Sequence, residues 1–313
     1  MIKLAIVVPC YNEEAVLTDS AQKLIGVINE LEEKKKISED SFILFVDDGS
    51  RDTTWDIIIQ LNSQNKHCKG LKLATNVGHQ NALLAGLMTI KDEVDASLSI
   101  DADLQDDIAC IELMVDKYAE GNEIVYGVRD DRSSDSWFKR TTAQGFYKFM
   151  NMLGVKIVYN HADFRLMGKQ SLQGLAEYKE RNLFLRGVVP LIGYKTATVS
   201  YERKERLAGE SKYPLKKMMA FAFDGVTSFS IKPINFILYA GVIMVIFAVV
   251  MAIYSLYSYA IGRVVSGWTS LMLSLWMIGG MLMCSLGIVG EYIGKIYMEV
   301  KERPRYIVQQ RLD

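Results

Sequence analysis

The sequence predicts an α/β domain with a mainly parallel sheet, followed by a C-terminal hairpin of two transmembrane helices. In the first two thirds of the chain, short β-branched or aromatic runs alternate with longer segments of helical spacing, which is typical of an α/β domain. The pattern changes after Lys232, because Arg263 is the only charged residue between Pro233 and Gly290. The chain therefore joins a charged, water-soluble part to a nearly charge-free part.

Three predicted strands of the soluble part end in turn-forming or acidic residues. They are the runs Leu4–Val8, Phe42–Val46 and Ala96–Ile100. The segments with helical spacing are Ala15–Lys34, Asn81–Ile90 and Ile108–Tyr118. Because ligands of open α/β sheets bind at the carboxyl ends of the strands, we expect the functional site where these acidic residues lie.

The strongest chemical signal is the run Asp101-Ala102-Asp103-Leu104-Gln105, directly after the third predicted strand. Residues i and i+2 of an extended chain point the same way, so Asp101 and Asp103 present two carboxylates on one side. Two close carboxylates repel each other unless a cation lies between them. Mg²⁺ commonly binds through one or two carboxylates plus substrate phosphates. We therefore predict a site for Mg²⁺ or Mn²⁺ and a nucleotide diphosphate, with a solvated turn as the alternative.

Two adjacent carboxylates, Asp47 and Asp48, follow the second predicted strand. A turn and a helix cap explain the next two residues, Gly49 and Ser50, but not this pair of acids. A carboxylate there can accept hydrogen bonds from a nucleobase or a ribose. The turn after the first predicted strand is similar.

In that first turn, Tyr11 or Pro9 is expected to lie against a base, and Glu13 or Glu14 near a ribose. Each of the three strand ends is a weak signal alone. Three polar strand ends in one sheet together predict a nucleotide-binding enzyme.

Two charge-free runs, 233–262 and 264–290, are each longer than the roughly 20 residues that span a bilayer. A buried soluble hairpin is the alternative. Lysines and arginines precede the first run and follow the second, whereas the connection holds only Arg263, so both ends and the α/β domain are predicted to be cytoplasmic. These flanking residues are Lys212, Lys216, Lys217, Lys232, Lys295, Lys301, Arg303 and Arg305.

The predicted boundaries follow from these runs. Residues 1–213 form the α/β domain, and residues 214–231 form a juxtamembrane amphipathic segment that lies on anionic lipid or packs on the domain. Residues 232–293 hold the two spans, at about 234–261 and 268–290, and residues 294–313 form a cytoplasmic tail. The apolar hairpin also allows self-association into a homo-oligomer.

Charge and cysteine usage exclude other classes. The 313 residues carry a formal net charge of −1, whereas nucleic-acid-binding domains usually show a strong basic excess, so no nucleic-acid partner is expected. The four cysteines, at positions 10, 68, 110 and 284, lack CxxC spacing. This favours reduced thiols over a disulfide framework or a zinc site, and a cytoplasmic soluble part.

Eight stretches spread over nearly the whole chain carry a family resemblance. They are VVPCYNEE at 7–14, VDDGSRDTT at 46–54, NVGHQNALLAGL at 76–87, DADLQD at 101–106, YGVRDDR at 126–132, DFRLM at 163–167, ERNLFLRGVVPLIGY at 180–194 and RKERLAGESKYPLKKM at 203–218. With them the chain resembles glycosyltransferase family 2, whose catalytic domain has the Rossmann-like GT-A fold. Within that family the chain looks like the polyprenyl-phosphate (bactoprenol) glucosyltransferases, which its predicted two-helix hairpin also resembles. Dolichol-phosphate mannose synthase is a more distant relative.

The resemblance implies a role for each matching position. The nucleotide sugar would be held by Pro9, Tyr11, Asn12, Glu13, Asp47, Asp48, Asp101, Ala102, Asp103, Arg206 and Lys212. The metal would be held by Asp101, Asp103 and Gln105, and the acceptor phosphate by Arg129, Arg140 and Ser211. The predicted catalytic residues are Asp101, Asp103, Arg129 and Lys212. Asp163 and Arg165 lie in a family motif, where a structural pairing is the alternative to a functional role.

The implied reaction is the inverting transfer of a hexose, with glucose favoured, from a UDP-sugar to polyprenyl (undecaprenyl) phosphate. The acceptor phosphate has a second pKa of about 6, so it is largely anionic at pH 7 and needs no general base. This agrees with the absence of a triad-like context around His67, His79 and His161. The implied location is the bacterial cytoplasmic membrane, as a multi-pass protein with a cytoplasmic catalytic domain.

Several alternatives stay open. The transferred sugar can instead be N-acetylglucosamine, galactose, aminoarabinose or mannose, with the same chemistry. A processive polysaccharide synthase would need more spans and a Q-x-x-R-W motif, and a lipid-anchored nucleotidyltransferase is less favoured still. A catalytically degenerate membrane scaffold is disfavoured by the intact DADLQ and SKY stretches. The chain departs from the family at Asp107-Ile108, where two prolines are frequent, and at His79-Gln80, which varies among relatives.

Overall fold

The structure, a computed structural model of the chain, describes residues 1–129, 161–180, 185–201 and 267–313, and scattered positions between 234 and 261. The chain divides into two compact units. The first contains an α/β sheet with its helices and also the C-terminal residues Arg303–Asp313. The second contains the long helix α10 (Trp268–Val300).

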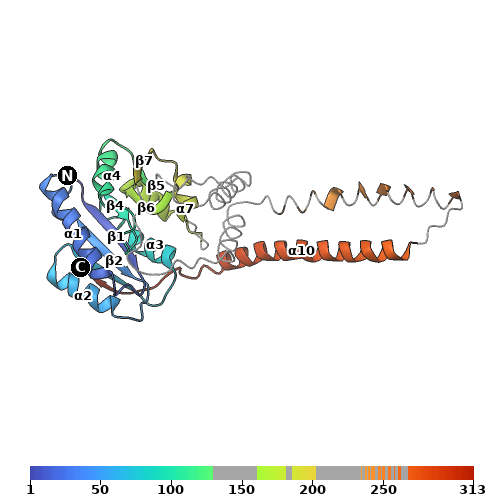
Figure 1. Cartoon of the computed structure of the whole chain (residues 1–313), viewed down its shortest axis with the longest axis horizontal. Coiled ribbons are helices and arrows are strands. Elements are labelled where there is room, and N and C mark those ends of the chain that lie inside the picture. Colours follow the sequence, from blue (N-terminus) through green and yellow to red (C-terminus); the bar gives the residue numbers. More distant parts are fainter. Residues whose placement is uncertain are drawn as a thin grey trace. The chain divides into compact units, whose positions relative to one another are not determined.

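Within the described residues, a mixed sheet of eight strands forms the centre of the first unit (Figure 1). The strands are β1 (Leu4–Cys10), β2 (Phe42–Asp47), β3 (Cys68–Leu73), β4 (Ala96–Ser99), β5 (Ile124–Arg129), β6 (His161–Gly168), β7 (Thr196–Tyr201) and β8 (Val308–Leu312), in the order β7-β5-β6-β4-β1-β2-β3-β8. β4, β1, β2 and β3 are parallel neighbours, while β6 and β8 run antiparallel to the strands beside them. The parallel centre aligns the carboxyl ends of β4, β1 and β2 at one edge.

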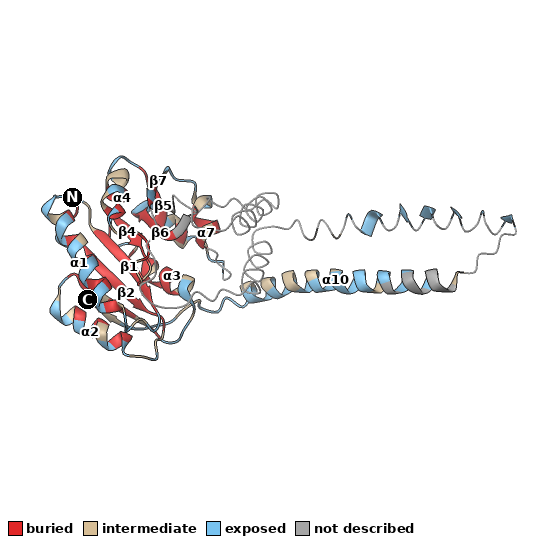
Figure 2. Ribbon diagram, in the orientation of Figure 1, coloured by how far each residue is buried: buried red, intermediate tan, exposed pale blue. Residues whose placement is uncertain are grey.

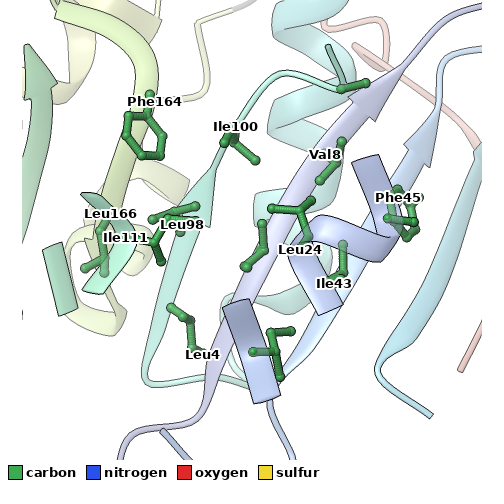
Figure 3. Packing of buried hydrophobic residues seen from close by; sticks show 14 of the residues in the cluster. Leu4, Val8, Leu24, Ile43, Phe45, Leu98, Ile100, Ile111, Phe164 and Leu166 are labelled. Atoms are coloured by element: carbon green, nitrogen blue, oxygen red, sulfur yellow. The ribbon is translucent and has the colours of Figure 1, made fainter. Parts of the chain in front are cut away.

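Three helices cover one face of this sheet. The apolar side chains on one side of each helix belong to the same buried cluster as side chains of the strands. The helices are α1 (Leu17–Glu33), α2 (Thr54–Gln64) and α4 (Cys110–Ala119). Figure 3 shows Leu24 of α1 near Ile43 of β2, and Ile111 of α4 near Leu98 and Leu166. Figure 2 shows burial over the first unit: the sheet is buried, and the helices that cover it are exposed on their outer sides.

Helix α3 (His79–Ile90) packs on the opposite face and approaches the strands closely. A Cβ atom at Gly86 would lie 2.5 Å from Val7 Cγ1 and 2.8 Å from Val46 Cγ2, so only glycine allows this approach. The described residues also form the short helices α6 (Lys169–Ala176) and α7 (Leu185–Val188) and the 3-10 turn η1 (Val189–Ile192). The predicted α/β class is thus confirmed.

Helix α10 extends from Trp268 to Val300, whereas the second span was predicted at about 268–290, so the helix is ten residues longer than that prediction. Within it, Met277–Val300 is long and apolar enough to cross a membrane, and it is the one such helix among the residues that the structure describes. The first predicted span is described only at scattered positions, so the two-helix hairpin stays a prediction. The amphipathic segment 214–231 lies outside the described residues.

The end of the chain forms a strand that the sequence analysis did not predict. Within the expected tail 294–313, strand β8 pairs antiparallel with β3, for example Gly70 with Leu312 and Lys72 with Gln310. Strand β8 therefore belongs to the sheet of the first unit.

Candidate active site

Hydrogen bonds join the two loops that follow the neighbouring strands β1 and β2. The Asn12 amide donates to Ser50 Oγ over 3.0 Å, and the Arg51 amide donates to Asn12 Oδ1 over 2.9 Å. Asn12 has a φ of 56°, a left-handed conformation that Asn tolerates better than most residues. Glu14 Oε2 accepts from both the amide (3.1 Å) and the hydroxyl (2.7 Å) of Thr53. The two strand ends therefore form one connected surface.

The predicted nucleotide-binding residues of the first loop differ in how the structure uses them. The side-chain oxygen of Asn12 accepts a hydrogen bond from the Arg51 amide. The backbone amide of Glu13 donates to Thr54 Oγ1 over 2.9 Å. Pro9 is buried in β1, opposite Val46. Tyr11 is 41% exposed, and is therefore the residue of this loop with an aromatic ring free to stack on a base.

Asp47, the last residue of β2, and Asp48, the next residue, are buried and hold turns. Asp47 Oδ1 accepts the Ser50 amide over 3.1 Å, which closes the local turn. Asp48 accepts two backbone amides from another loop, that of Val77 at 2.7 Å and that of Gly78 at 2.9 Å. Burial raises the pKa of Asp48, and these two backbone bonds oppose that rise. In the structure, Asp48 thus fixes the turn that leads into α3.

The predicted metal residues lie directly after β4. The Ile100 amide donates to the Val7 carbonyl over 3.1 Å, which keeps this segment beside the end of β1. Ala102 is buried, and its carbonyl accepts the Ser20 hydroxyl over 2.6 Å. Asp103 Oδ1 accepts the Gln105 amide over 3.4 Å, and Gln105 is buried. The run predicted to hold the metal is therefore anchored on both sides of its acidic residues.

The charges around Asp101 fit a divalent cation. Burial, together with the carboxylates of Asp163, Asp106 and Asp103, raises the pKa of Asp101 to about 6, while the His79 imidazole opposes the rise. A cation beside Asp101 would remove this repulsion, and carboxylate oxygens are hard ligands that suit Mg²⁺ and Mn²⁺. Among the described residues, no group of three or more His, Cys, Asp and Glu side chains could hold a metal ion. Substrate phosphate would have to complete the coordination of a metal held here.

A second cluster lies beside Asp101 and is centred on Asp163 of β6. The Asp163 carboxylate accepts bonds from Arg165 Nη2 at 3.1 Å and from Arg186 Nη2 at 2.9 Å, and His79 Nε2 lies 3.7 Å away. Despite its burial, the pKa of Asp163 lies well below the usual range, because His79, Arg186 and Arg165 stabilise the ionised carboxylate. Arg165 is fully buried. The structural pairing that the sequence analysis gave as the alternative for Asp163 and Arg165 is thus present, and it extends to the Arg186 guanidinium and the His79 imidazole.

The first turn of α3 connects the two acidic groups. His79 Nε2 lies 3.4 Å from Asp101 Oδ1, and Gln80 Oε1 accepts the Leu185 amide at the start of α7 over 3.1 Å. His79, Gln80 and Arg186 were given no role from the sequence. All three lie in stretches that carry the family resemblance, His79 and Gln80 in NVGHQNALLAGL and Arg186 in ERNLFLRGVVPLIGY.

Several predicted residues fall outside the described part of the chain. They are Arg140, Arg206, Ser211 and Lys212. The backbone of Arg129 ends β5, where it pairs with Tyr201 of β7. The roles that the resemblance implies for these five positions stay predictions.

Comparisons with known proteins give the family. The sequence model of glycosyl transferase family 2 matches residues 5–175. The chain belongs to glycosyltransferase family 2. The predicted family is therefore confirmed, and the family match covers strands β1 to β6 and most of helix α6.

Individual family 2 relatives match over nearly their whole length. The chain is 55% identical to the uncharacterized glycosyltransferase YkoT of Bacillus subtilis, over 97% of this chain and 90% of that protein. It is 37% identical to the prophage bactoprenol glucosyl transferase homolog of Escherichia coli, over 99% of both chains. It is 36% identical to the bactoprenol glucosyl transferase of Shigella phage SfX, over 99% of this chain and all of that protein.

A solved structure shares the family 2 fold. Mannosyl-3-phosphoglycerate synthase from Rubrobacter xylanophilus superposes with a TM-score of 0.50 at 17% identity, over 72% of each chain. At this identity the likeness concerns the fold alone, and it agrees with the predicted GT-A catalytic domain.

Proposed function

We propose that this chain transfers a hexose, with glucose as the first choice, from a UDP-sugar to polyprenyl phosphate at the cytoplasmic face of a bacterial membrane. The observation that carries the proposal is the position of Asp101 and Asp103 at the end of β4, beside the joined loops after β1 and β2. Full-length relatives named bactoprenol glucosyl transferase, at 36–37% identity, support the choice of acceptor and sugar.

The donor would lie along the carboxyl edge of the sheet. Tyr11 offers an exposed ring for the base, and Asp47 and Asp48 close the turns behind it. The diphosphate would lie near Asp101 and Asp103, where Mg²⁺ or Mn²⁺ would neutralise the charge of the departing UDP. Asp101, Asp103 and Gln105 are the residues that would hold such a metal.

The chemical step needs an anionic nucleophile and a stabilised leaving group. An oxygen of the acceptor phosphate attacks the anomeric carbon, the bond from that carbon to the UDP oxygen breaks, and UDP leaves with the electron pair. Because the acceptor phosphate is already ionised, no proton has to be removed. Direct displacement inverts the anomeric centre. The protein's part is positioning and charge stabilisation.

Cationic side chains help two anions to approach each other. His79, Arg165 and Arg186 surround Asp163 next to Asp101. One buried carboxylate thus faces three basic groups, which favours anionic phosphates on this side of the site. Arg129, Arg140, Arg206, Ser211 and Lys212 are the further candidates for the acceptor and donor phosphates.

The membrane part of the proposal rests on α10. Met277–Val300 satisfies the length and composition of a span, and many of its large apolar side chains are exposed. We propose that it pairs with a first span near 234–261 in a multi-pass hairpin, with both ends cytoplasmic. Such an anchor would keep the site near the lipid headgroups.

The test uses the purified full chain in vesicles that contain undecaprenyl phosphate. Radiolabelled UDP-glucose, UDP-N-acetylglucosamine, UDP-galactose and GDP-mannose are supplied in turn, each with Mg²⁺, with Mn²⁺ or with a chelator. We expect label in the lipid phase from UDP-glucose, and none with the chelator. Label from another donor replaces glucose in the proposal, and no label from any donor favours a degenerate scaffold.

A further inference from the structure

The acidic run 101–106 turns through a residue with left-handed backbone. Leu104 lies between Asp103 and Gln105 and has a φ of 44°, and its amide donates to the Asp101 carbonyl over 3.1 Å. Residues other than glycine rarely adopt this conformation, and it persists where the surrounding contacts hold it. The directions of the Asp103 and Gln105 side chains therefore depend on the contacts that fix this turn.

A hydrogen bond from another element holds the turn on each side. Before Leu104, the Ser20 hydroxyl of α1 donates to the Ala102 carbonyl over 2.6 Å. After it, the hydroxyl of Tyr201, the last residue of β7, donates to Asp106 Oδ1. Tyr201 and Asp106 are both buried. A bond to an ionised acceptor is stronger than one to a neutral acceptor, so the second anchor is the firmer of the two.

Packing fixes the ring of Tyr201. It meets the ring of Phe164 on β6 edge to face, with centroids 5.4 Å apart and an angle of 88° between the planes. Both rings lie close to the backbone of β5, because a Cβ atom at Gly127 would lie 2.5 Å from Phe164 Cδ1 and 3.1 Å from Tyr201 Cε1. The Tyr201 backbone pairs with Arg129 of the same strand. The hydroxyl therefore meets Asp106 from a fixed direction.

Asp106 lies close to the residues predicted to hold the metal. It directly follows Gln105 in the chain, and its carboxylate is one of the charges that raise the pKa of Asp101. Loss of its bond to Tyr201 would let the Asp106 side chain and the turn before it shift. Residues that orient metal ligands from behind commonly change metal affinity or activity by about 10- to 100-fold when they are replaced.

We propose that Tyr201 is a positioning residue of the metal site: by holding Asp106, it fixes the turn that presents Asp103 and Gln105 to the metal and the donor diphosphate. This inference rests on the proposed function, because it needs a divalent metal at that turn. It adds a residue of β7, a strand to which the sequence analysis gave no role in the site.

The experiment removes the two ends of this bond in turn. Tyr201→Phe deletes the hydroxyl and keeps the ring that packs on Phe164. Asp106→Ala deletes the carboxylate, whereas Asp106→Asn keeps an oxygen that can accept the hydroxyl. The purified full chain in detergent is titrated with Mn²⁺ in the presence of UDP and followed by electron paramagnetic resonance, against a sample of Mn²⁺ and UDP without protein.

The Kd for Mn²⁺ is the first readout. We expect it to rise about tenfold in Tyr201→Phe, and at least as much in Asp106→Ala. The double variant should bind no more weakly than Asp106→Ala alone, because both changes remove the same bond. Asp106→Asn should stay within about threefold of the wild type. A loss in Asp106→Asn as large as that in Asp106→Ala would make Asp106 a metal ligand and overturn the positioning role.

Transfer activity is the second readout. At a Mn²⁺ concentration equal to the wild-type Kd, a tenfold weaker site is filled to about one tenth instead of one half, so turnover in Tyr201→Phe should fall about fivefold. Saturating Mn²⁺ should restore it, because the ligands are displaced and not lost. A loss that saturating Mn²⁺ does not restore would show a merely structural role and overturn the proposal.

Tyr118→Phe is the matched control. It deletes a hydroxyl of α4 that donates to the Asp95 carbonyl over 3.0 Å, at the opposite end of β4 from the acidic run. Its Kd for Mn²⁺ should equal that of the wild type. An equal rise in Tyr118→Phe, or no rise in Tyr201→Phe, would overturn the inference while the metal site stands. If the wild type binds no Mn²⁺ with UDP, the metal site of the proposed function has failed, and the inference fails with it.

Discussion

His79 Nε2 lies 3.4 Å from Asp101 Oδ1, so the first residue of α3 faces the first carboxylate of the predicted metal site. The contact depends on residues far apart in sequence. Asp48 binds the amides of Val77 and Gly78, and this places His79 between Asp101 and Asp163. The turn that precedes α3 thereby links the residues that follow β2 with those that follow β4.

This relationship predicts how the pKa of Asp101 responds to a change at His79. The imidazole lowers the pKa of Asp101, which is about 6 in the metal-free protein. His79→Gln removes the imidazole and should raise that pKa further, whereas His79→Lys keeps a basic group and should leave it near its present value. Carboxyl ¹³C shifts of the metal-free protein, followed with pH, measure the midpoint. An unchanged midpoint in His79→Gln would contradict the arrangement.

A second prediction concerns the close approach of the loop after β2 to the turn before α3. Gly49 has a φ of +66°, and a Cβ atom there would lie 2.7 Å from Asn76 N. Gly49→Ala should lower the free energy of unfolding by about 1–3 kcal/mol, because it adds left-handed strain and a backbone clash. The KM of the donor should rise as well, since the turn that leads to His79 is displaced.

The control for this substitution is Gly26→Ala in α1. A Cβ at Gly26 meets nothing within 4 Å, and the residue lies within a helix. It should stabilise the protein by about 0.5–1 kcal/mol, since alanine loses less entropy than glycine in a helix. Chemical unfolding in detergent compares both variants. Equal effects of the two substitutions would show that the approach at Gly49 is not tight.

A third prediction is the pH dependence of the stability that the ion pair between Arg311 of β8 and Glu93 contributes. The pair consists of two bonds of 2.7 Å. The hydrogen bonds from Arg311 hold the pKa of Glu93 below its ordinary value. A lowered folded-state pKa means that the stabilisation is complete above the unfolded pKa, about 4.3, and is lost as the pH falls through the folded value. Glu93→Gln should therefore be less stable than the wild type at pH 7, and the difference should vanish in acid.

Thermal unfolding from pH 7 downward measures this difference. Asp92→Asn is the matched control, because Asp92 is an adjacent carboxylate whose exposed side chain pairs with Lys91 and also interacts with Gln173. An exposed pair of this kind contributes little to stability. A difference between Glu93→Gln and the wild type that persisted in strong acid would exclude the ion pair as its cause.

The strand ends could be predicted from the sequence because their signal is local. Asp101 and Asp103 follow a short apolar run, and the pattern of two carboxylates after a buried strand identifies both the element and its chemistry. Asp47 and Asp48 were found in the same way. Their partners were not, because the amides that Asp48 binds lie about 30 residues further on and carry no side-chain signal.

The other omissions have related causes. Asp163, Arg165 and Arg186 meet His79 only once β6, α7 and α3 are packed, so their spacing in the chain shows no pattern. Strand β8 reads VQQRL, which is short and polar, and it becomes a strand because β3 offers a free edge. Such elements depend on tertiary contacts rather than on local preference.

The last prediction tests the metal role of the acidic run directly. Asp103→Asn removes one carboxylate but keeps an oxygen that can accept the weak 3.4 Å bond from the Gln105 amide. We expect Mn²⁺ binding, followed by electron paramagnetic resonance, to weaken by about tenfold or more, since one charged hard ligand is lost. Transfer activity should fall with it, while the circular dichroism spectrum stays unchanged. Asp107→Asn is the matched control, because Asp107 accepts a similar 3.4 Å bond from a nearby amide, that of Ala109. Near-normal Mn²⁺ binding and turnover in Asp103→Asn, or an equal loss in Asp107→Asn, would refute a specific role for Asp103 in holding the metal.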